Sequence, residues 1–384
     1  MFADLFSLRS LASILALTPL FAARRIVVPP EPADGPSAVQ WISEADGLDS
    51  PKVSPINRTT YEWWYFDLIS KDTDCDERLQ SITTVFYLST DGGFTPLAGY
   101  WKLGYTSVDL VQITASFANG TIFQALLNAS QAIFSPNGNA ATGVYTGKAG
   151  KASFRGKADL SAYTVKIDAP ELGIVGTIEL DSVAPPRYPG GPVKKGQSMQ
   201  FAPHLGWANA IPGSKGAASF VINGEKWGFK GHGYHDKRQD SSRNQNWGDV
   251  PFSGITDSWY WGHCRLGDYS IVWVDFLTPD GENILASYVA KNEKTLVARS
   301  SGIKVRPFGE NSTYPPVLGT GAPTGFRVDI EVPKGKISFN VTSDNIIGGG
   351  SGQFYTRWTG LVKGGLNGAT DLTGTAMYEQ FVLA

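Results

Sequence analysis

The sequence has few of the residues that redox, metal and nucleophilic chemistry require. Its 384 residues include only two cysteines, three methionines and four histidines. Neither a dinucleotide-binding glycine fingerprint nor a Gly-x-Ser-x-Gly nucleophile elbow occurs. No Gly-Lys-Ser/Thr follows the glycine-rich segment 348–352, so this segment predicts a loop before a strand rather than a phosphate site. We therefore expect no cofactor, and we expect Cys75 and Cys264 to be unpaired thiols.

The chain also lacks a strong charge of either sign and a sustained helical pattern. A formal net charge of −2 leaves no electrostatic footprint for nucleic acid, so we expect a neutral or apolar small molecule as the partner. Beyond residues 11–23, apolar residues show no period of 3.6. With 44 glycines, 42% apolar and 12% aromatic residues, the composition predicts a turn-rich β protein, and the length favours two domains.

Residues 11–23 form an apolar run near the start of the chain. The run is flanked by Arg9 and Arg24, is too short to span a membrane, and matches the central region of a signal peptide. Asp4 and the absence of a small-x-small cleavage site count against this interpretation. Five sequons are compatible with a secretory route: Asn57, Asn119, Asn128, Asn311 and Asn340. We expect a signal peptide over residues 1–25, with a cytoplasmic location as the alternative.

The segment 61–67, Tyr-Glu-Trp-Trp-Tyr-Phe-Asp, predicts a strand rich in aromatic residues. Alternation gives each face of this strand one carboxylate, with Trp63, Tyr65 and Asp67 on one face and Glu62, Trp64 and Phe66 on the other. Two interpretations stay open. The acids bond backbone amides at the rim of a sheet, or one of them points into a cavity, where burial raises its pKa and makes it a hydrogen-bond donor.

Short apolar segments separated by turn residues continue along the chain at roughly ten-residue spacing, which is typical of β-sandwiches and barrels. A hairpin is predicted over residues 218–229, with Asn223 and Gly224 at its turn, and a second pairing joins 270–277 to 284–289. Residues 183–192 are rich in proline and glycine. We therefore expect an all-β fold with an N-terminal barrel domain over 26–190 and a C-terminal one over 191–384.

The four histidines and five of the eleven tryptophans lie in or just before residues 227–273. In a strand His232 and His235 point in opposite directions, and no Glu-x-x-His or clustered cysteines accompany them, so no metal site is expected. This stretch is either a dense aromatic core or part of a ligand cavity, which usually combines apolar walls with a few convergent polar groups.

Several segments, in this order, resemble the fungal Diels–Alderases, which are distant relatives of carotenoid hydratases of the hydroxyneurosporene-synthase type. They are residues 61–67, 202–207, 233–236 with 246–249, 258–263 and 355–360. The resemblance extends from about residue 50 to the C-terminus. One departure is the polar insertion 237–245, which predicts an enlarged loop that caps the mouth of a pocket.

The resemblance implies two lipocalin-like β-barrel or β-sandwich domains, with the substrate bound in a pocket between them. It also implies a stereoselective intramolecular [4+2] cycloaddition of a linear polyene that carries a tetramic acid or pyrrolinone. The product would be a decalin or a macrocycle-fused ring of secondary metabolism. A polyketide synthase–peptide synthetase would supply the substrate, and the oligomeric state stays open.

A cycloaddition requires that the polyene be held in one folded arrangement, and aromatic side chains offer rigid apolar walls for this task. A hydrogen bond to the carbonyl beside the dienophile would stabilise charge in the transition state. We expect the catalytic donor among a protonated Glu62 or Asp67, Tyr65, Asn209 and His235. The substrate-binding residues are expected to be Trp64, Trp207, Tyr234, Asp236, Trp247, Trp259, Trp261 and Trp358.

Two other functions fit the same residues. Hydration or isomerisation of a terpenoid alkene would use the carboxylates, and a lipocalin-like carrier would need only the apolar pocket.

Overall fold

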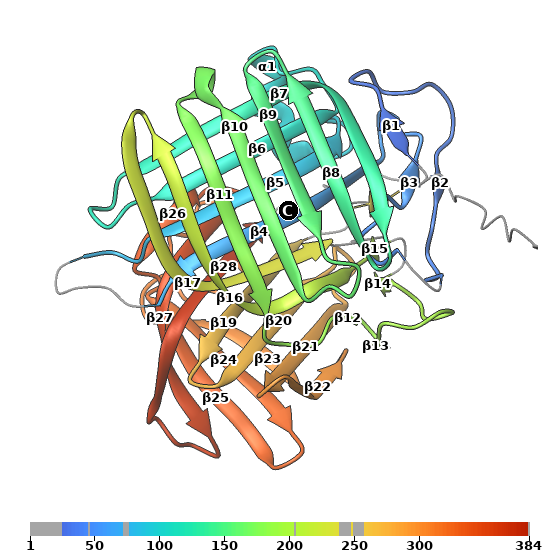
Figure 1. Ribbon diagram of the computed structural model, residues 1–384. Helices are drawn as coiled ribbons and strands as arrows, with labels where there is room; N and C mark the ends of the chain where they lie inside the picture. The colour runs from blue at the N-terminus through green and yellow to red at the C-terminus, as the bar shows by residue number, and fades with distance from the viewer. Residues whose placement is uncertain are drawn as a thin grey trace, which may run out of the picture.

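The computed structural model describes residues 25–44, 47–71, 77–202, 205–237, 247–248 and 257–382. Most of the secondary structure of these residues lies in two large antiparallel sheets (Figure 1). The main strands of the first sheet are β4 (Tyr61–Ser70), β5 (Ser81–Ser89), β6 (Asp109–Ser116), β7 (Ile122–Asn137), β8 (Ala140–Gly147), β9 (Gly150–Gly156), β10 (Ala162–Ala169), β11 (Ile174–Ser182), β16 (Ala208–Ile222) and β17 (Glu225–Lys237). Those of the second are β19 (Ser258–Leu266), β20 (Tyr269–Leu277), β21 (Asn283–Lys291), β22 (Lys294–Arg299), β23 (Ile303–Phe308), β24 (Gly325–Val332), β25 (Gly335–Thr342), β26 (Asn345–Gly349), β27 (Tyr355–Leu366) and β28 (Leu372–Val382).

Short elements complete the structure. They are the strands β1 (Ile26–Val28), β2 (Ala38–Val39), β3 (Val53–Ser54), β12 (Arg187–Tyr188), β13 (Gly191–Pro192), β14 (Gln200–Ala202), β15 (Leu205–Gly206) and β18 (Trp247–Gly248), the 3₁₀ turns η1 (Thr95–Leu97) and η2 (Pro170–Leu172), and the helix α1 (Ala98–Lys102). In the described residues no helix is long and apolar enough to cross a membrane. The predicted all-β fold is confirmed.

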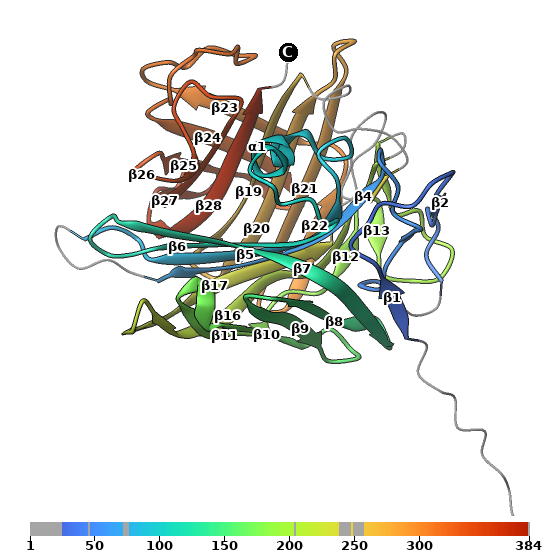
Figure 2. The ribbon, with the colours of Figure 1, turned by 90° about the horizontal axis from the view of Figure 1, so that it is seen from above.

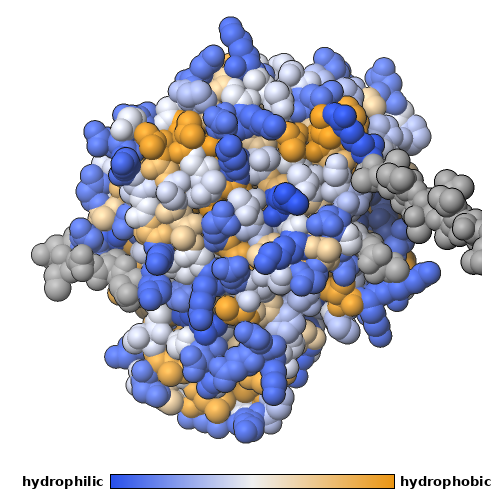
Figure 3. All heavy atoms as spheres, viewed as in Figure 1, coloured by the Kyte–Doolittle hydropathy of each residue, from blue (hydrophilic) through white to orange (hydrophobic). Residues whose placement is uncertain are grey.

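The first sheet closes into a barrel. Its strands follow the order β11-β10-β9-β8-β7-β6-β5-β4-β17-β16, and β11 also pairs with β16, so ten strands return to their starting point. Closure leaves these strands without a free edge. Side chains fill the interior, where Trp64, Phe66, Phe86, Phe134 and Phe154 belong to one buried cluster. The outer face of β8 to β11 is turned away from the second sheet, and hydrophilic side chains are scattered over it (Figure 3).

The second sheet is an open half-barrel that covers another part of the first barrel. Its main path runs from β22 through β19 and β28 to β23, with β26 beside β27. One face of β19 packs Trp259 and Trp261 into a cluster that also contains Tyr65 and Tyr234 from the outer surface of the barrel. The opposite face of the sheet has a core of its own, which includes Tyr260. Figure 2 shows α1 in the space between the barrel and the second sheet.

Both predicted hairpins are present. Ile222 pairs with Glu225 across Asn223 and Gly224, whose φ angles of 50° and 87° suit a type I′ turn, and β20 pairs with β21. The division expected at residue 190 does not coincide with the division between the sheets, because β16 and β17 complete the first barrel. As a statement about domains it stays a prediction. Cys264 is buried and unpaired, whereas Cys75, the residues 1–24 of the expected leader and residues 238–245 of the insertion lie outside the described residues.

The contact between β4 and β17 requires glycine at position 231. A Cβ atom there would lie 1.7 Å from the carbonyl oxygen of Ile69, which is backbone and cannot rotate away. We expect Gly231→Ala to lower the midpoint of thermal unfolding by several degrees, because the barrel seam must open to relieve the clash. Gly99→Ala is the matched control, since a Cβ at Gly99 in α1 meets nothing within 4 Å. An unchanged midpoint in Gly231→Ala would contradict this account of the seam.

Candidate active site

Strand β4 separates two different environments, as alternation predicts. Trp64 and Phe66 point into the closed barrel, whereas Tyr65 points outward, into the layer between the barrel and the second sheet. Nine of its ten residues are buried, so both faces of the strand are covered. The two carboxylates of the segment therefore have separate surroundings: Asp67 shares the outer face with Tyr65, and Glu62 lies inside the barrel.

A cavity of about 340 Å³ lies in the layer between the barrel and the second sheet. We call it the interlayer cavity. The barrel contributes side chains from β4 to β7, and the second sheet contributes side chains from β19, β27 and β28. Trp63, Trp259 and Trp261 form apolar walls, and Leu97 and Tyr100 of the η1–α1 segment cover one side. The cavity combines aromatic surface with a small number of polar groups, which is the usual composition of a small-molecule site.

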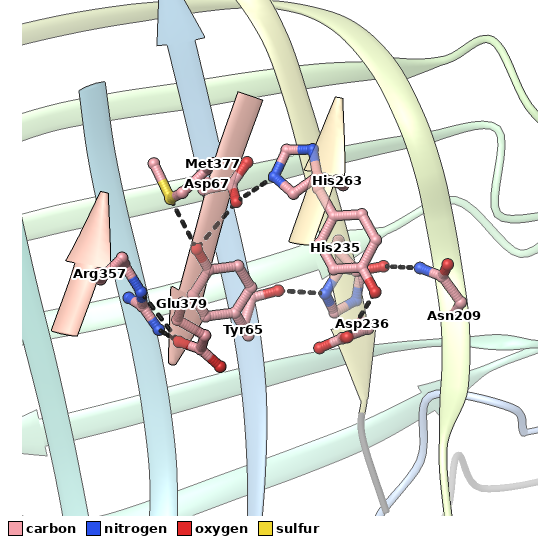
Figure 4. A network of polar contacts seen from close by, with 10 residues as sticks. Tyr65, Asp67, Asn209, His235, Asp236, His263, Arg357, Met377 and Glu379 are labelled. Atoms are coloured by element: carbon pink, nitrogen blue, oxygen red, sulfur yellow. Dashed lines mark hydrogen bonds and ion pairs between the residues drawn. The ribbon is translucent and has the colours of Figure 1, made fainter. Parts of the chain in front are cut away.

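Tyr65 is the lining residue with the most developed polar support. Its hydroxyl donates to Oδ2 of Asp67 at 2.8 Å and lies 3.0 Å from the sulfur of Met377 (Figure 4). Nε2 of His263 lies 2.7 Å from the same Asp67 oxygen. Tyr234 stacks on His263 with ring centroids 4.7 Å apart. Burial raises the pKa of Tyr65 well above its usual value, so this phenol keeps its proton, which it donates to Asp67 in the structure.

An ion pair from the second sheet lies beside Tyr65. Nη2 and Nε of Arg357 donate to Oε2 of Glu379 at 2.7 and 3.1 Å, and the hydroxyl of Tyr355 donates to the same oxygen at 3.2 Å. The guanidinium carbon lies 4.8 Å from the centre of the Tyr65 ring. Burial alone would lower the pKa of Arg357, but Tyr355, Tyr65 and Glu379 outweigh it and raise this pKa well above its usual value. The guanidinium of Arg357 therefore keeps its positive charge next to Tyr65, with the carboxylate of Glu379 as its counter-charge.

Asp236 forms a third polar group at the cavity. Its Oδ2 accepts hydrogen bonds from the hydroxyl of Tyr234 at 2.5 Å and from Nε1 of Trp207 at 3.0 Å. Tyr234 and Trp207 stand behind the lining residues, and Trp261 lies 5.3 Å from the Tyr234 ring in an edge-on arrangement. Of the residues expected from sequence, the structure thus places Tyr65, Asp236, Trp259 and Trp261 on the cavity, and Asp67, Tyr234 and Trp207 directly behind it.

Glu62 and His235, both predicted to be catalytic, do not line the cavity. Inside the barrel, Oε1 of Glu62 lies 2.7 Å from Nζ of Lys237, and Nε2 of His235 lies 3.3 Å from Oδ2 of Asp49. All four side chains are inaccessible to solvent. Burial raises the pKa of Glu62 and lowers that of Lys237 to about 8. The alternation that points Tyr65 and Tyr234 outward necessarily points Glu62 and His235 inward.

Three other predicted residues also lie away from the cavity lining, and a fourth, Trp247, cannot be placed relative to it. Trp64 packs inside the barrel, where Nζ of Lys237 lies 3.6 Å from its ring centre. Trp358 belongs to the separate core of the second sheet and stacks on Tyr378. Asn209 donates from Nδ2 to the backbone carbonyl of His235 at 3.0 Å, a positioning contact. Trp247 lies in β18 opposite Glu62, but its side chain falls outside what the structure describes.

Several functional candidates were missed by the sequence interpretation. Arg357, Glu379 and Tyr355 line the cavity from the second sheet, and Tyr87 and Gln112 line it from the barrel. Alternation within the segment 355–360 would have placed Tyr355 and Arg357 on the face opposite Trp358. In the part of the chain that the structure describes, no group of three His, Cys, Asp or Glu side chains is arranged to hold a metal ion.

The aromatic cavity between two β sheets, with its phenol, guanidinium and carboxylates, agrees with the comparison to known proteins. A model of the family described as Diels-Alderase-like matches residues 31–305, which is most of the chain. The chain belongs to the Diels-Alderase-like family. The expected family resemblance is confirmed, and members of this family act on small molecules of secondary metabolism.

The chain matches two curated relatives over most of its length and shares its fold with one solved structure. It is 36% identical over 355 residues to the quinolone epoxide rearrangement protein asqO of Emericella nidulans, covering 91% of this chain and 90% of that protein. It is 33% identical over 375 residues to the quinolone epoxide rearrangement protein penF of Penicillium thymicola, covering 94% and 96%. The crystal structure of CghA with Sch210972 shares the fold, with a TM-score of 0.72 and 17% identity over 94% of this chain and 99% of that chain.

Proposed function

We propose that this protein catalyses the rearrangement of an epoxide carried by a quinolone-like aromatic lactam, an isomerisation that needs no second substrate. The observation that carries the proposal is the polar group Tyr65, Asp67, His263 and Arg357, which meets the aromatic walls at one end of the interlayer cavity. Two relatives at 36% and 33% identity, both named as quinolone epoxide rearrangement proteins, support the choice of substrate class.

The residues suit each step of such a rearrangement. As a carbon–oxygen bond of the epoxide breaks, the hydroxyl of Tyr65 rotates from Asp67 to the substrate, and the epoxide oxygen takes the bonding pair and accepts the Tyr65 proton. The neighbouring substituent migrates with its electron pair to the electron-poor carbon. When the new carbonyl forms, the proton on oxygen returns to Tyr65, so atoms and electrons balance without an oxidant or reductant.

The surroundings of Tyr65 stabilise the charges that appear in this sequence. Arg357, 4.8 Å from the ring of Tyr65, favours the transient phenolate, and Asp67 with His263 holds the phenol in place. The faces of Trp259 and Trp261 attract the positive charge on carbon. The aromatic walls also limit the access of water, which would otherwise capture the cation and give a diol.

A [4+2] cycloaddition of a polyene is the second candidate function, and the family description favours it. The same cavity would hold the polyene between its aromatic walls, and Tyr65 with Arg357 would polarise the carbonyl beside the dienophile. The rearrangement takes precedence because the relatives named for it match at least 91% of this chain.

The test is incubation of the purified protein with a synthetic quinolone epoxide, followed by chromatography and mass spectrometry. We expect one isomer of unchanged mass to form faster than in buffer and in preference to the diol. Formation of the diol alone, or of the same products at the same rate as in buffer, would refute the rearrangement. If the protein instead speeds the cyclisation of a linear polyene to one diastereomer and has no effect on the epoxide, the second candidate function would be established.

A further inference from the structure

A row of polar side chains crosses the barrel wall of the interlayer cavity. In the strand register Asp67 of β4 pairs with Thr83 of β5, Thr83 with Thr114 of β6, and Thr114 with Gln124 of β7. Residues paired in this way point to the same face of a sheet. Thr83, Thr114 and Gln124 all line the cavity, so we call these three side chains the amide-binding row.

The side chains of this row have no partner of their own. Thr83 and Thr114 are only 3% and 7% exposed, whereas the side chain of Gln124 is exposed, and within the described residues neither the two hydroxyls nor the amide of Gln124 forms a hydrogen bond. Gln112 on the same wall differs, because its Oε1 accepts from Tyr87 at 3.2 Å and its Nε2 donates to Tyr100 at 2.9 Å. Buried hydroxyls without partners cost free energy unless a ligand satisfies them.

We infer that the amide-binding row is the subsite for a cyclic cis-amide, the lactam edge of the substrate. This inference rests on the function proposed above, because it assigns the place of the ring system in the same cavity. A cis-lactam carries an N–H donor beside a C=O acceptor, and the glutamine amide of Gln124 presents the complementary pair. The hydroxyls of Thr83 and Thr114 donate to the carbonyl or accept from the ring substituents.

The row begins at Thr83, beside Asp67, and its other two members lie progressively further from Tyr65. Neighbouring strands lie about 4.8 Å apart, so Thr114 and Gln124 stand roughly 10 and 14 Å from β4, which carries Tyr65. A bicyclic lactam seated on the row would therefore extend its side chain, and the epoxide on it, toward Tyr65 and Arg357. The row selects the ring system, whereas Tyr65 performs the chemistry.

The test measures the binding of quinolone and of N-methylquinolone by quenching of tryptophan fluorescence. The wild-type protein should bind quinolone about tenfold more tightly, the size expected for one lost hydrogen bond. In the double variant Thr114→Val with Gln124→Leu the preference should fall below about twofold, because the N–H and the carbonyl no longer find partners. In turnover, this variant should show a larger rise in KM than fall in kcat.

Matched controls come from the same strands. Thr84 is next to Thr83 but faces the barrel interior, and Gln131 is exposed on β7 like Gln124 but does not line the cavity, so Thr84→Val and Gln131→Leu should both keep the tenfold preference. A double variant that keeps the preference, or a wild-type protein that shows none, would overturn the subsite. If the protein prefers quinolone but does not convert the epoxide, the subsite is supported and the proposed rearrangement is refuted. If it converts the epoxide without preferring quinolone, the rearrangement is supported and the subsite is refuted.

Discussion

Replacing Tyr65 by phenylalanine should lower kcat for the epoxide rearrangement by about a hundredfold to a thousandfold. The change removes the only atom through which Tyr65 reaches the substrate oxygen, and a positioned acid typically contributes 10²- to 10⁴-fold. The ring remains and still contacts Arg357 and Trp261, so binding of the substrate should change little. Steady-state kinetics of the purified variant measure both quantities, and circular dichroism establishes that it is folded.

Tyr87→Phe is the matched control for this prediction. Tyr87 also lines the cavity, but its hydroxyl donates to Gln112 rather than to Asp67. Its loss should change kcat by less than about threefold, because the hydroxyl takes no part in the proton transfer. Equal effects of the two replacements, or a Tyr65→Phe variant as active as the wild type, would show that another group supplies the proton.

Replacing Glu62 by glutamine should destabilise the protein by about 3 to 5 kcal/mol, because it leaves the ammonium of Lys237 buried without its counter-charge. For a chain of this size the midpoint of thermal unfolding should fall by roughly 5 °C. Below that temperature the variant should keep its kcat, since Glu62 lies inside the barrel and does not contact the cavity. A large loss of kcat in a folded Glu62→Gln variant would restore the catalytic role expected from sequence.

The pairing of Glu62 with Lys237 is tested further by a double-mutant cycle. Lys237→Met combined with Glu62→Gln should cost less than the sum of the single changes, because neither partner is left charged alone. Burial lowers the pKa of Lys237 to about 8 from 10.5. Between these values the unfolded chain binds a proton that the folded protein has released, so the free energy of unfolding rises with pH. Lys237→Met should remove part of that rise, and additive effects at a constant pH slope would contradict the pairing.

Alternation in the segment 61–67 predicted the structure of β4 correctly, including the two faces on which its acids lie. The sequence did not reveal which face borders the cavity, because both faces are buried and aromatic. That choice depends on where β17 and the second sheet pack. Lys237, the partner of Glu62, is far from it in the sequence, because the strands β5 to β16 lie between them along the chain. From the sequence alone, Glu62 and His235 were therefore as good candidates for catalysis as Asp67 and Tyr65. The pairing of β4 with β17 distinguishes them, because it shows which side chains face the cavity.

The second sheet was predicted less completely than the first. Its hairpin between residues 270–277 and 284–289 follows from turn signals, which are local. The ion pair of Arg357 with Glu379 could not be predicted from local sequence, because it forms only when β27 and β28 pair and bring the two side chains opposite each other. Trp358 drew attention as a large aromatic residue, yet its size suits the core of the second sheet equally well. Composition identifies aromatic residues, but it does not distinguish the three separate cores that they form.

One face of β4 packs in the barrel core and the other borders the interlayer cavity. Substitutions in the barrel core can therefore change the substrate selectivity of the cavity. A smaller residue at Trp64 or Phe66 would shift the backbone that carries Tyr65, although neither side chain faces the substrate. Relatives with identical lining residues can thus differ in the molecules they accept. Engineers who seek a new product specificity have a second, hidden set of positions to vary.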